Sequence, residues 1–327
     1  MSVRGGLDLG GTKIQAVVVD AGGQVLGEAR RPTPTSGGPD DVARELAASM
    51  HEASGAAGIE PAALTGVGVG SPGEIDASAG TVAQARNLPN WIHPYPLVHV
   101  LSKELDTPVS LGNDVSVATQ AEFELGAGKE FHSLLGVFWG TGVGGGIVIG
   151  GALWTGRGAA GELGHVVIKE DGRRCPCGRR GCLEAYAGRA SMEAQARKLH
   201  KKGGHTDLFH IMERRGRTRL TSGVWARALE RDDELAVKIV DRAVKALGTG
   251  VASAVNLLDV EAVVIGGGLG VRLGQEYADR IAAAMQPHLF VDERPPVVRV
   301  AALGDLGGAI GASLLARRPT RVRRAAA

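Results

Sequence analysis

The sequence predicts an α/β protein made of two similar halves. Glycine accounts for 50 of the 327 residues, and these glycines punctuate short apolar runs instead of forming a linker. The stretch GLDLGGTKIQAVVVDAGGQVLGEA, from Gly6, is typical of a strand, a glycine turn, a strand, a turn and a strand. LLGVFWGTGVGGGIVIGGALW, from Leu134, repeats that plan. Because the same unit occurs once in each half, we expect two similar domains that face each other across a cleft.

The segments between and after the two hairpins predict further elements. PDDVARELAASMHEASG, from Pro39, has helical periodicity, with Asp40 as its N-cap. PVSLG predicts a strand that ends at Asn113 and Asp114, where a helix begins. The later stretch LGDLGGAIGASLLA predicts a last helix after a glycine-rich entry. The polar, glycine-marked segment of residues 201–220 predicts a surface excursion between two helices.

Composition and charge exclude several classes of function. The chain has 37 basic and 35 acidic residues, so it lacks the broad basic field of a nucleic-acid or membrane-surface protein. The arginine-rich end, RRPTRVRRAAA, is typical of a solvated tail. No signal peptide opens the sequence, and no apolar run reaches the about 20 residues that span a bilayer. We therefore expect a cytoplasmic protein without a membrane or nucleic-acid partner.

The glycine turns predict phosphate binding. The pattern GxGxxG occurs three times, but never between a strand and a helix as in a dinucleotide fingerprint, and no GK[ST] phosphate loop is present. In LDLGGTK the turn exposes backbone N–H groups, adds a hydroxyl and a cation, and carries a carboxylate that could hold Mg²⁺ through water. These residues are Gly10 and Gly11, Thr12, Lys13 and Asp8.

Two further glycine turns in the second half predict the rest of a nucleotide site. GTG offers a second phosphate turn, and VVIGGGLG follows a strand and is suited to a nucleotide's base and ribose. Any one of these turns alone is more simply explained as a tight turn, but together they favour a nucleotide. The residues are Gly140, Thr141, Gly142, Gly266, Gly267 and Gly268.

Seven motifs carry a resemblance to a known family. LDLGGTK, GSPGEID, ND, GTGVGGG, GELGH, CPCGRRGCLE and VVIGGGLG occur in the order typical of the ROK family of sugar kinases, and they span nearly the whole chain. The pair GELGH and CxCGxxGCxE is the most specific, and the sequence is most similar to the family's bacterial ATP-dependent glucokinases. The resemblance implies an actin-like, ribonuclease-H-like fold in two lobes, with ATP and Mg²⁺ as co-substrates and a zinc ion in the larger lobe.

The three cysteines predict a structural zinc site. Cys175, Cys177 and Cys182 are the chain's only cysteines, and an odd number argues against a disulfide framework. Three thiolates are soft ligands, tetrahedral zinc takes one more, and His165 stands ten residues before Cys175, where the family also has it. With all four positions filled, no site remains for a catalytic water. The alternatives are three unrelated buried thiols or a redox pair.

The resemblance also assigns the sugar and the chemistry. Asp114 would be the general base that takes the proton of the sugar's 6-hydroxyl, although an aspartate at a helix start is most often an N-cap. A zinc knuckle would fix Glu162 and Glu184, which lie on its two arms, for hydrogen bonds to the sugar hydroxyls. The expected substrate-binding residues are Gly73, Asn87, Asn113, Asp114, Glu162, His165 and Glu184.

These placements predict the domains and the function. We expect a small lobe of residues 1–114 and 307–327, a large lobe of residues 115–306, and a homo-oligomer, dimeric or tetrameric. The implied activity is the ATP-dependent phosphorylation of glucose to glucose 6-phosphate. The alternatives are a kinase for mannose, fructose, N-acetylglucosamine or N-acetylmannosamine, or a sugar-sensing ROK regulator. Such regulators carry a DNA-reading module before the phosphate loop, whereas Asp8 is the eighth residue here; polyphosphate in place of ATP stays open.

Overall fold

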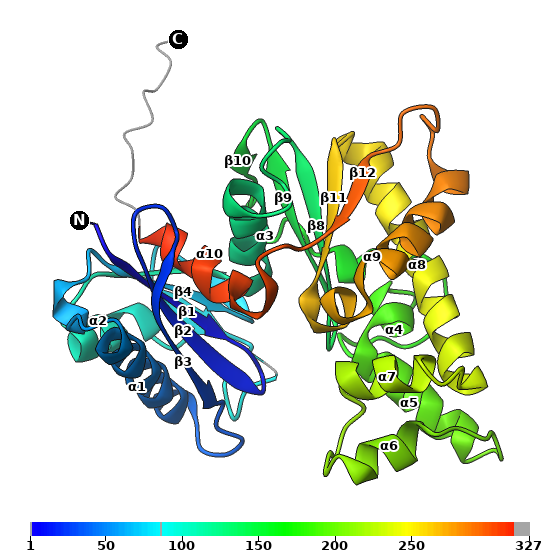
Figure 1. Ribbon diagram of the computed structural model, residues 1–327, viewed down its shortest axis with the longest axis horizontal. Coiled ribbons are helices and arrows are strands. Elements are labelled where there is room, and N and C mark those ends of the chain that lie inside the picture. Colours follow the sequence, from blue (N-terminus) through cyan, green and yellow to red (C-terminus); the bar gives the residue numbers. More distant parts are fainter. Residues whose placement is uncertain (1, 86, 317–327) are drawn as a thin grey trace. The chain divides into compact units, whose positions relative to one another are not determined.

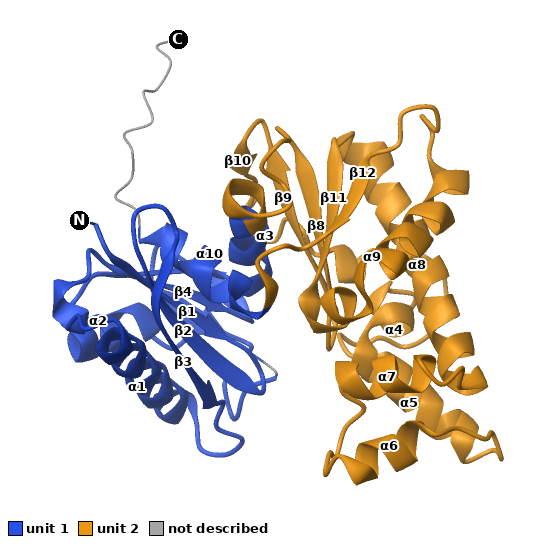
Figure 2. Cartoon of the chain, viewed as in Figure 1, with its two compact units in different colours: residues 1–121, 305–327 blue, residues 122–304 orange. Residues whose placement is uncertain are grey.

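The chain forms two compact units, which the computed structural model describes over residues 2–85 and 87–316 (Figures 1 and 2). The first unit runs to Ala121 and takes up the chain again at Asp305, and the second unit is residues 122–304. The arginine-rich tail noted in the sequence lies outside the described residues. Among the described helices, none is both long and apolar enough to cross a membrane.

The first unit is built on a mixed five-stranded sheet with the strand order β3-β2-β1-β4-β7. The strands β3, β2 and β1 are antiparallel neighbours, whereas β4 pairs parallel with β1, and β7 pairs parallel with β4. A short hairpin of two further strands, β5 and β6, follows β4. The strands are β1 (Arg4–Leu9), β2 (Lys13–Val19), β3 (Val25–Pro32), β4 (Val67–Ser71), β5 (Glu74–Asp76), β6 (Thr81–Ala83) and β7 (Val109–Asn113).

Helices cover both faces of this sheet. Successive residues of a strand point to opposite faces, and a Cβ on Gly5 would contact Met50 of α1, whereas a Cβ on Gly6 would meet Ala309 of α10. The helix α1 therefore packs on one face and α10 on the other. The helical elements of this unit are α1 (Pro39–Ala56), η1 (Pro61–Ala63), α2 (Leu97–Leu105), the start of α3 (Asp114–Leu125), η4 (Gly304–Leu306) and α10 (Gly307–Leu315).

Two glycines allow α10 to approach the sheet closely. A Cβ on Gly6 of β1 would lie 1.9 Å from the Ala309 carbonyl oxygen, and a Cβ on Gly68 of β4 would lie 1.7 Å from that of Ala312. No side chain can occupy these positions unless the helix moves. The glycine that opens GVGSPG therefore serves helix packing, which is why this pattern does not mark a nucleotide loop.

The second unit repeats the sheet of the first. Its strand order is β10-β9-β8-β11-β12, again with two antiparallel pairs followed by two parallel pairs. The predicted recurrence of the glycine-turned hairpin, and the α/β fold class, are thus confirmed. The strands are β8 (Leu134–Trp139), β9 (Val143–Ile149), β10 (Ala152–Leu153), β11 (Ala262–Gly266) and β12 (Val297–Val300).

Helices supply most of the second unit's core. The long helix α8 buries one apolar face, with Ile239, Val240 and Leu247 nearly inaccessible, and α9 packs along it. The helical elements are the end of α3, η2 (Leu163–His165), α4 (Glu184–Ala187), α5 (Arg189–His200), α6 (Leu208–Arg214), α7 (Ser222–Leu229), α8 (Glu234–Leu258), α9 (Gly267–Met285) and η3 (Gln286–His288).

Two local predictions were wrong. The N-cap of α1 is Gly38, whose N–H donates to the Asp41 side chain (2.9 Å), whereas Asp40 accepts a hydrogen bond from the Tyr95 hydroxyl. Because Pro39 takes the first helical position, the N-cap lies two residues before the predicted Asp40. Residues 201–220 are not a mere surface excursion either, because they contain α6, whose apolar residues Leu208, Ile211 and Met212 are buried.

The close approach of α10 generates a stability prediction. We expect Gly68→Ala to lower the free energy of unfolding by about 2 kcal/mol or more, because the methyl group overlaps the α10 backbone. Gly55→Ala in α1 is the control, since nothing lies within 4 Å of the added Cβ, and it should stabilise by up to about 1 kcal/mol. Urea unfolding of both variants measures the difference. Equal stability of the two variants would contradict the packing role of Gly68.

Candidate active site

The predicted phosphate loop of the first unit is the turn between β1 and β2. The Gly10 N–H donates to the Lys13 carbonyl oxygen across the turn (3.0 Å), which leaves Gly11 and Thr12 at an exposed tip. The Asn87 side chain lies over this tip, because a Cβ on Gly11 would be 3.0 Å from Asn87 Nδ2. The structure thus places Asn87, a predicted sugar-binding residue, beside the predicted phosphate loop.

Asp8 lies on β1 just before this turn, and its carboxyl group has an unusual environment. It is half-buried against the first turn of α10, where a Cβ on Gly308 would lie 2.7 Å from Asp8 Oδ2. Burial first, and then the Asp114 carboxylate, raise the pKa of Asp8 to about 7, although Lys13 acts in the opposite direction. Two neighbouring carboxyl groups of this kind fit a divalent cation, bound directly or through water.

Lys13, the predicted phosphate cation, is engaged in an ion pair. Its Nζ lies 3.2 Å from Asp305 Oδ2, and Arg30 approaches the same oxygen at 3.6 Å. The Asp305 side chain is 73% exposed, so the pair contributes little stability. A phosphate group can therefore replace Asp305 as the partner of Lys13 at small cost.

Asn113 and Asp114 stand where β7 ends and α3 begins, as the sequence predicts. The helix cap is Asn113, because its Oδ1 accepts the N–H of Ser116 three residues on (3.0 Å). Asp114 Oδ1 accepts the neighbouring N–H of Val115 (2.9 Å). The capping interpretation of Asp114 is thus wrong, since the preceding residue performs that role.

Gly73 occupies a position that only glycine adopts without strain. Its φ is +100°, and a Cβ would lie 2.5 Å from the Ala83 carbonyl oxygen at the β5–β6 hairpin. This geometry explains the glycine. A contact between Gly73 and a sugar stays a prediction.

The second unit gathers the four predicted metal ligands. Their ligand atoms all lie within 4.8 Å of one another, with Cys177 Sγ 3.8 Å from Cys182 Sγ and Cys175 Sγ 3.9 Å from His165 Nδ1. Zn–S bonds of about 2.3 Å at tetrahedral angles place two sulfurs about 3.8 Å apart, whereas a disulfide needs about 2.0 Å. The donor set and its spacing therefore fit zinc, and all three cysteines are free.

The predicted sugar carboxylates adjoin this cluster. His165 uses Nδ1 towards the thiols, and its other ring nitrogen lies 3.8 Å from Glu162 Oε2. Glu184 begins α4, and its Oε1 lies 3.9 Å from Cys175 Sγ. Glu162, His165 and Glu184 thus lie around one cluster, as the spacing of the knuckle predicts.

The phosphate turn of the second unit is tied to Glu184. The Gly140 N–H donates to the Gly142 carbonyl oxygen (3.0 Å), and the following N–H, of Val143, donates to Glu184 Oε2 (3.0 Å). A Cβ on Gly142 would lie only 2.2 Å from the same oxygen. Glycine at position 142 is therefore needed for the carboxylate to reach the turn.

The third glycine turn joins β11 to α9. A Cβ on Gly140 would lie 3.9 Å from the Gly268 backbone nitrogen, so this turn is a neighbour of the phosphate turn. Gly267 has a φ of +78°, and a Cβ there would be 2.7 Å from the Trp139 backbone. The segment that follows, Gly267–Met285, is helical on both sides of a break at Gly274, whose φ is +74°.

One residue beside the phosphate turn was missed. Arg189 begins α5, and its guanidinium donates to the Thr141 hydroxyl and to the Leu220 carbonyl oxygen. Nothing in the local sequence GRAS marks this arginine, because Thr141 and Leu220 are distant along the chain. Only the fold brings them together.

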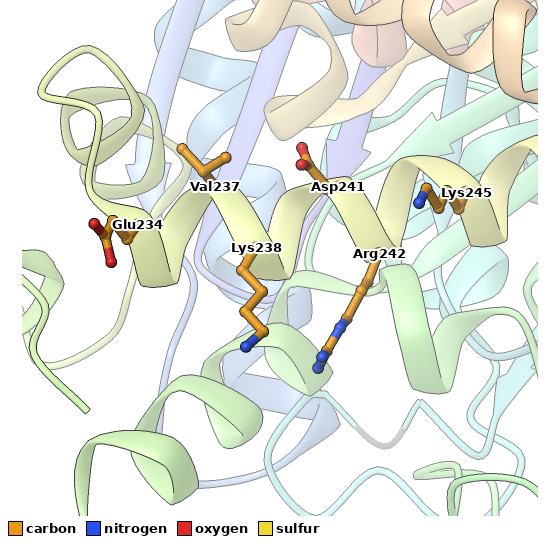
Figure 3. A pocket seen from close by; sticks show the side chains of 6 residues that line it. All are labelled: Glu234, Val237, Lys238, Asp241, Arg242 and Lys245. Carbon is orange, nitrogen blue, oxygen red and sulfur yellow. The ribbon is translucent and has the colours of Figure 1, made fainter. Parts of the chain in front are cut away.

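The surface also carries a hollow of about 410 Å³ on α8. Figure 3 shows the side chains of one helix that line it, with Lys238 and Arg242 extending to the same side. The lining residues are Glu234, Val237, Lys238, Asp241, Arg242 and Lys245. None of these is a predicted site residue, so the hollow does not enter the site.

A sheet that occurs twice, with a glycine turn in each copy, and a Cys₃His cluster beside carboxylates are the features that the resemblance to sugar kinases predicts. The ROK family model matches residues 4–319, and the chain therefore belongs to the ROK family. The predicted resemblance is confirmed.

Relatives and solved structures support this placement. A glucokinase of Thermotoga maritima is 37% identical over 265 residues, which cover 81% of each chain. An N-acetylmannosamine kinase of Haemophilus influenzae is 30% identical, over 94% of this chain and 93% of that one. The crystal structure of a ROK glucokinase from Streptomyces griseus with glucose and AMPPNP superposes with a TM-score of 0.83 at 31% identity, covering 97% of this chain and 99% of the other. The predicted fold is confirmed with it.

The cluster generates a metal prediction. We expect the purified protein to hold about one zinc per chain, and Cys177→Ser to lose the metal and to unfold at a lower temperature, because three ligands hold zinc less tightly than four. His210→Ala, which removes an exposed histidine outside the cluster, should keep the zinc. Elemental analysis and thermal unfolding measure both. Zinc-free protein with unchanged heat resistance would refute the site.

The pKa of Asp8 generates a pH prediction for metal-free protein. Between about pH 4 and 7 the unfolded state loses the Asp8 proton while the folded state keeps it, so folding stability falls as the pH rises. Asp8→Asn removes this loss. We therefore expect the variant to unfold at a higher temperature than the parent at pH 8, and the gain to disappear near pH 4. A variant that is no more stable at pH 8 would contradict the raised pKa.

Proposed function

We propose that this chain is an ATP-dependent glucokinase, which transfers the γ-phosphoryl group of ATP to the 6-hydroxyl of glucose. The observation that carries the proposal is the carboxylate pair Glu162 and Glu184 at the Cys₃His cluster, together with the phosphate turn that Glu184 binds directly. Glucokinases are among the relatives similar over most of the chain, and the similar Streptomyces griseus enzyme was solved with glucose and AMPPNP.

In the proposed reaction the chain's own residues position the reactants. The exposed N–H groups of Gly11 and Thr12, and Lys13, bind phosphate oxygens of the nucleotide. Mg²⁺, held at Asp8 directly or through water, would neutralise phosphate charge. Asp114 takes the proton of the sugar hydroxyl as that oxygen attacks. Asp114 follows Asn113, whose side chain caps the helix.

The sugar is recognised by groups with hydrogen-bonding capacity left over. Asn113 uses its oxygen for the cap, so its amide N–H groups can donate to a sugar hydroxyl. The free ring nitrogen of His165 and the neighbouring Glu162 carboxylate, which is 63% exposed, can serve two further hydroxyls. A zinc ion at the cluster would fix the arms that carry Glu162 and Glu184.

A kinase for N-acetylmannosamine is the second candidate. The observation that favours it is the similarity to the Haemophilus influenzae N-acetylmannosamine kinase over nearly the whole chain. The two sugars differ at the 2-position. A single contact there can decide between them, since a site built to bind a hydroxyl rejects sugars that lack it.

ADP release with ATP and Mg²⁺ across a sugar panel tests the proposal. The panel contains glucose, mannose, fructose, N-acetylglucosamine and N-acetylmannosamine, and we expect the highest kcat/KM for glucose. The highest value for N-acetylmannosamine would favour the second candidate, and no ADP release with any sugar would refute both. A parallel assay with polyphosphate in place of ATP decides the donor.

Two further features belong to the proposal. We place the enzyme in the cytoplasm, where ATP is available, and we expect a dimer or tetramer. Light scattering of the purified protein measures the oligomeric state.

Asp114→Asn generates the mechanistic prediction. Asparagine preserves the shape of the side chain but cannot accept the proton, so we expect kcat for glucose to fall by about 10² or more. The variant should still bind glucose, because the amide retains part of the hydrogen bonding. Steady-state kinetics and calorimetric glucose affinity are measured side by side. A folded, glucose-binding variant with kcat within about threefold of the parent would remove Asp114 from the mechanism.

A further inference from the structure

Arg189 is fixed to the phosphate turn of the second unit by its backbone. It is the first residue of α5, and its N–H donates to the Gly140 carbonyl oxygen (3.1 Å). The next N–H, of Ala190, donates to the Thr141 carbonyl oxygen (3.0 Å). Two consecutive backbone hydrogen bonds thus hold the start of α5 against the turn.

The side chain of Arg189 returns to the same turn. Its Nη2 donates to Thr141 Oγ1 (2.8 Å), and its Nη1 donates to the Leu220 carbonyl oxygen (2.8 Å). A guanidinium group can only donate, so the Thr141 oxygen is the acceptor in this bond. The hydroxyl hydrogen of Thr141 therefore points away from Arg189 and remains available for another acceptor. Thr141 itself is exposed, so a ligand can reach that hydrogen.

The charge of Arg189 is not matched by a carboxylate of its own. The acidic group that acts on Arg189 electrostatically, Glu193, binds Arg197 (2.8 Å) and Arg219 (3.2 Å), and its side chain is 5% exposed. Over the described residues, no carboxylate lies within salt-bridge distance of Arg189, and its buried Nε has no hydrogen-bond partner. Burial lowers the pKa of Arg189, while Glu193 opposes this effect. A partly buried cation without a counter-ion is costly, and a bound anion would remove that cost.

We propose that Arg189 is a positioning residue for the nucleotide, which directs the Thr141 hydroxyl hydrogen to a phosphate oxygen of ATP. Its positive charge strengthens this hydrogen bond, because it polarises the hydroxyl that donates to the anionic phosphate. This inference rests on the proposed function, since it takes the ligand of the Gly140–Gly142 turn to be a nucleotide phosphate.

Arg197 provides the matched control on the same helix. It carries the same guanidinium group as Arg189, but it is paired with Glu193, and its hydrogen bonds go to Glu193, Met212 and Thr218. If Arg189 only supported the fold, replacing either arginine would have similar consequences.

The experiment compares Arg189→Gln with Arg197→Gln. We expect Arg189→Gln to raise the KM for ATP about tenfold, which corresponds to about 1.4 kcal/mol, and to leave the KM for glucose within about twofold. Arg197→Gln should leave both KM values within about twofold. Similar KM values for ATP in the two variants would overturn the proposal, as would an equal rise in both KM values of Arg189→Gln.

A double-mutant cycle tests that Arg189 acts through the hydroxyl. Thr141→Val should raise the KM for ATP, and adding Arg189→Gln to it should raise the KM by less than about twofold more, because the hydroxyl is already absent. Effects that simply multiply would overturn the proposal. So would an unchanged KM for ATP in Thr141→Val, which decides the matter even where Arg189→Gln does not fold.

The parent enzyme separates failure of this inference from failure of the proposed function. Calorimetric binding of AMPPNP and the sugar panel are measured on it first. A parent that neither binds AMPPNP nor phosphorylates any sugar would refute both proposals. A parent that is an active kinase, with an Arg189→Gln variant whose KM for ATP is unchanged, would refute only the role of Arg189.

Discussion

The carboxylate of Glu184 is the group on which the second unit's site depends. One of its oxygens accepts the Val143 N–H that follows the phosphate turn, and the other lies against the sulfur of Cys175. Its position is therefore fixed from two directions. The residue opposite has to be Gly142, since a methyl group there would overlap the same oxygen.

This arrangement couples three functions within one unit. Because Glu184 follows Cys182 by two residues, any change in the metal cluster moves the carboxylate, and the carboxylate in turn holds the turn that we assign to the nucleotide. A metal at the cluster can thus influence both proposed substrates. The physical link is a short chain of hydrogen bonds and close contacts, and it needs no large movement.

The parts of the site that the sequence predicted are those determined by local spacing. Three cysteines within eight residues are close in space because they are close in sequence. Glycine turns between apolar runs likewise predict hairpins from local sequence alone. Other features depend on long-range packing. The N-cap of α1 is Gly38, whose N–H is bound by the Asp41 side chain. The buried apolar residues of α6 stand among polar residues in the sequence. Arg189 contacts Thr141 only in the folded chain, because the two are distant in sequence.

The glycines likewise include some that local sequence explains and others that only long-range packing explains. Their abundance predicts phosphate turns; glycine turns do join β1 to β2 and β8 to β9, and their binding of phosphate stays a prediction. Yet Gly6 and Gly68 are glycines because α10 lies against them, with no ligand involved. The residue type alone cannot separate the two causes, because both exclude a Cβ atom. The neighbour decides: at Gly6 and Gly68 it is the backbone of a packed helix, whereas at the exposed tip formed by Gly11 it is the side chain of Asn87.

Each unit keeps a charged group at an energetic cost. In the first, Asp8 is partly buried near a second carboxylate, so its ionisation is opposed. In the second, Arg189 is partly buried and no described carboxylate pairs with it. Opposite charges from ligands would relieve both, a cation at Asp8 and a phosphate beside Arg189. Nucleotide binding would then raise the free energy of unfolding, because the nucleotide and its metal supply the opposite charges that these two groups lack in the chain.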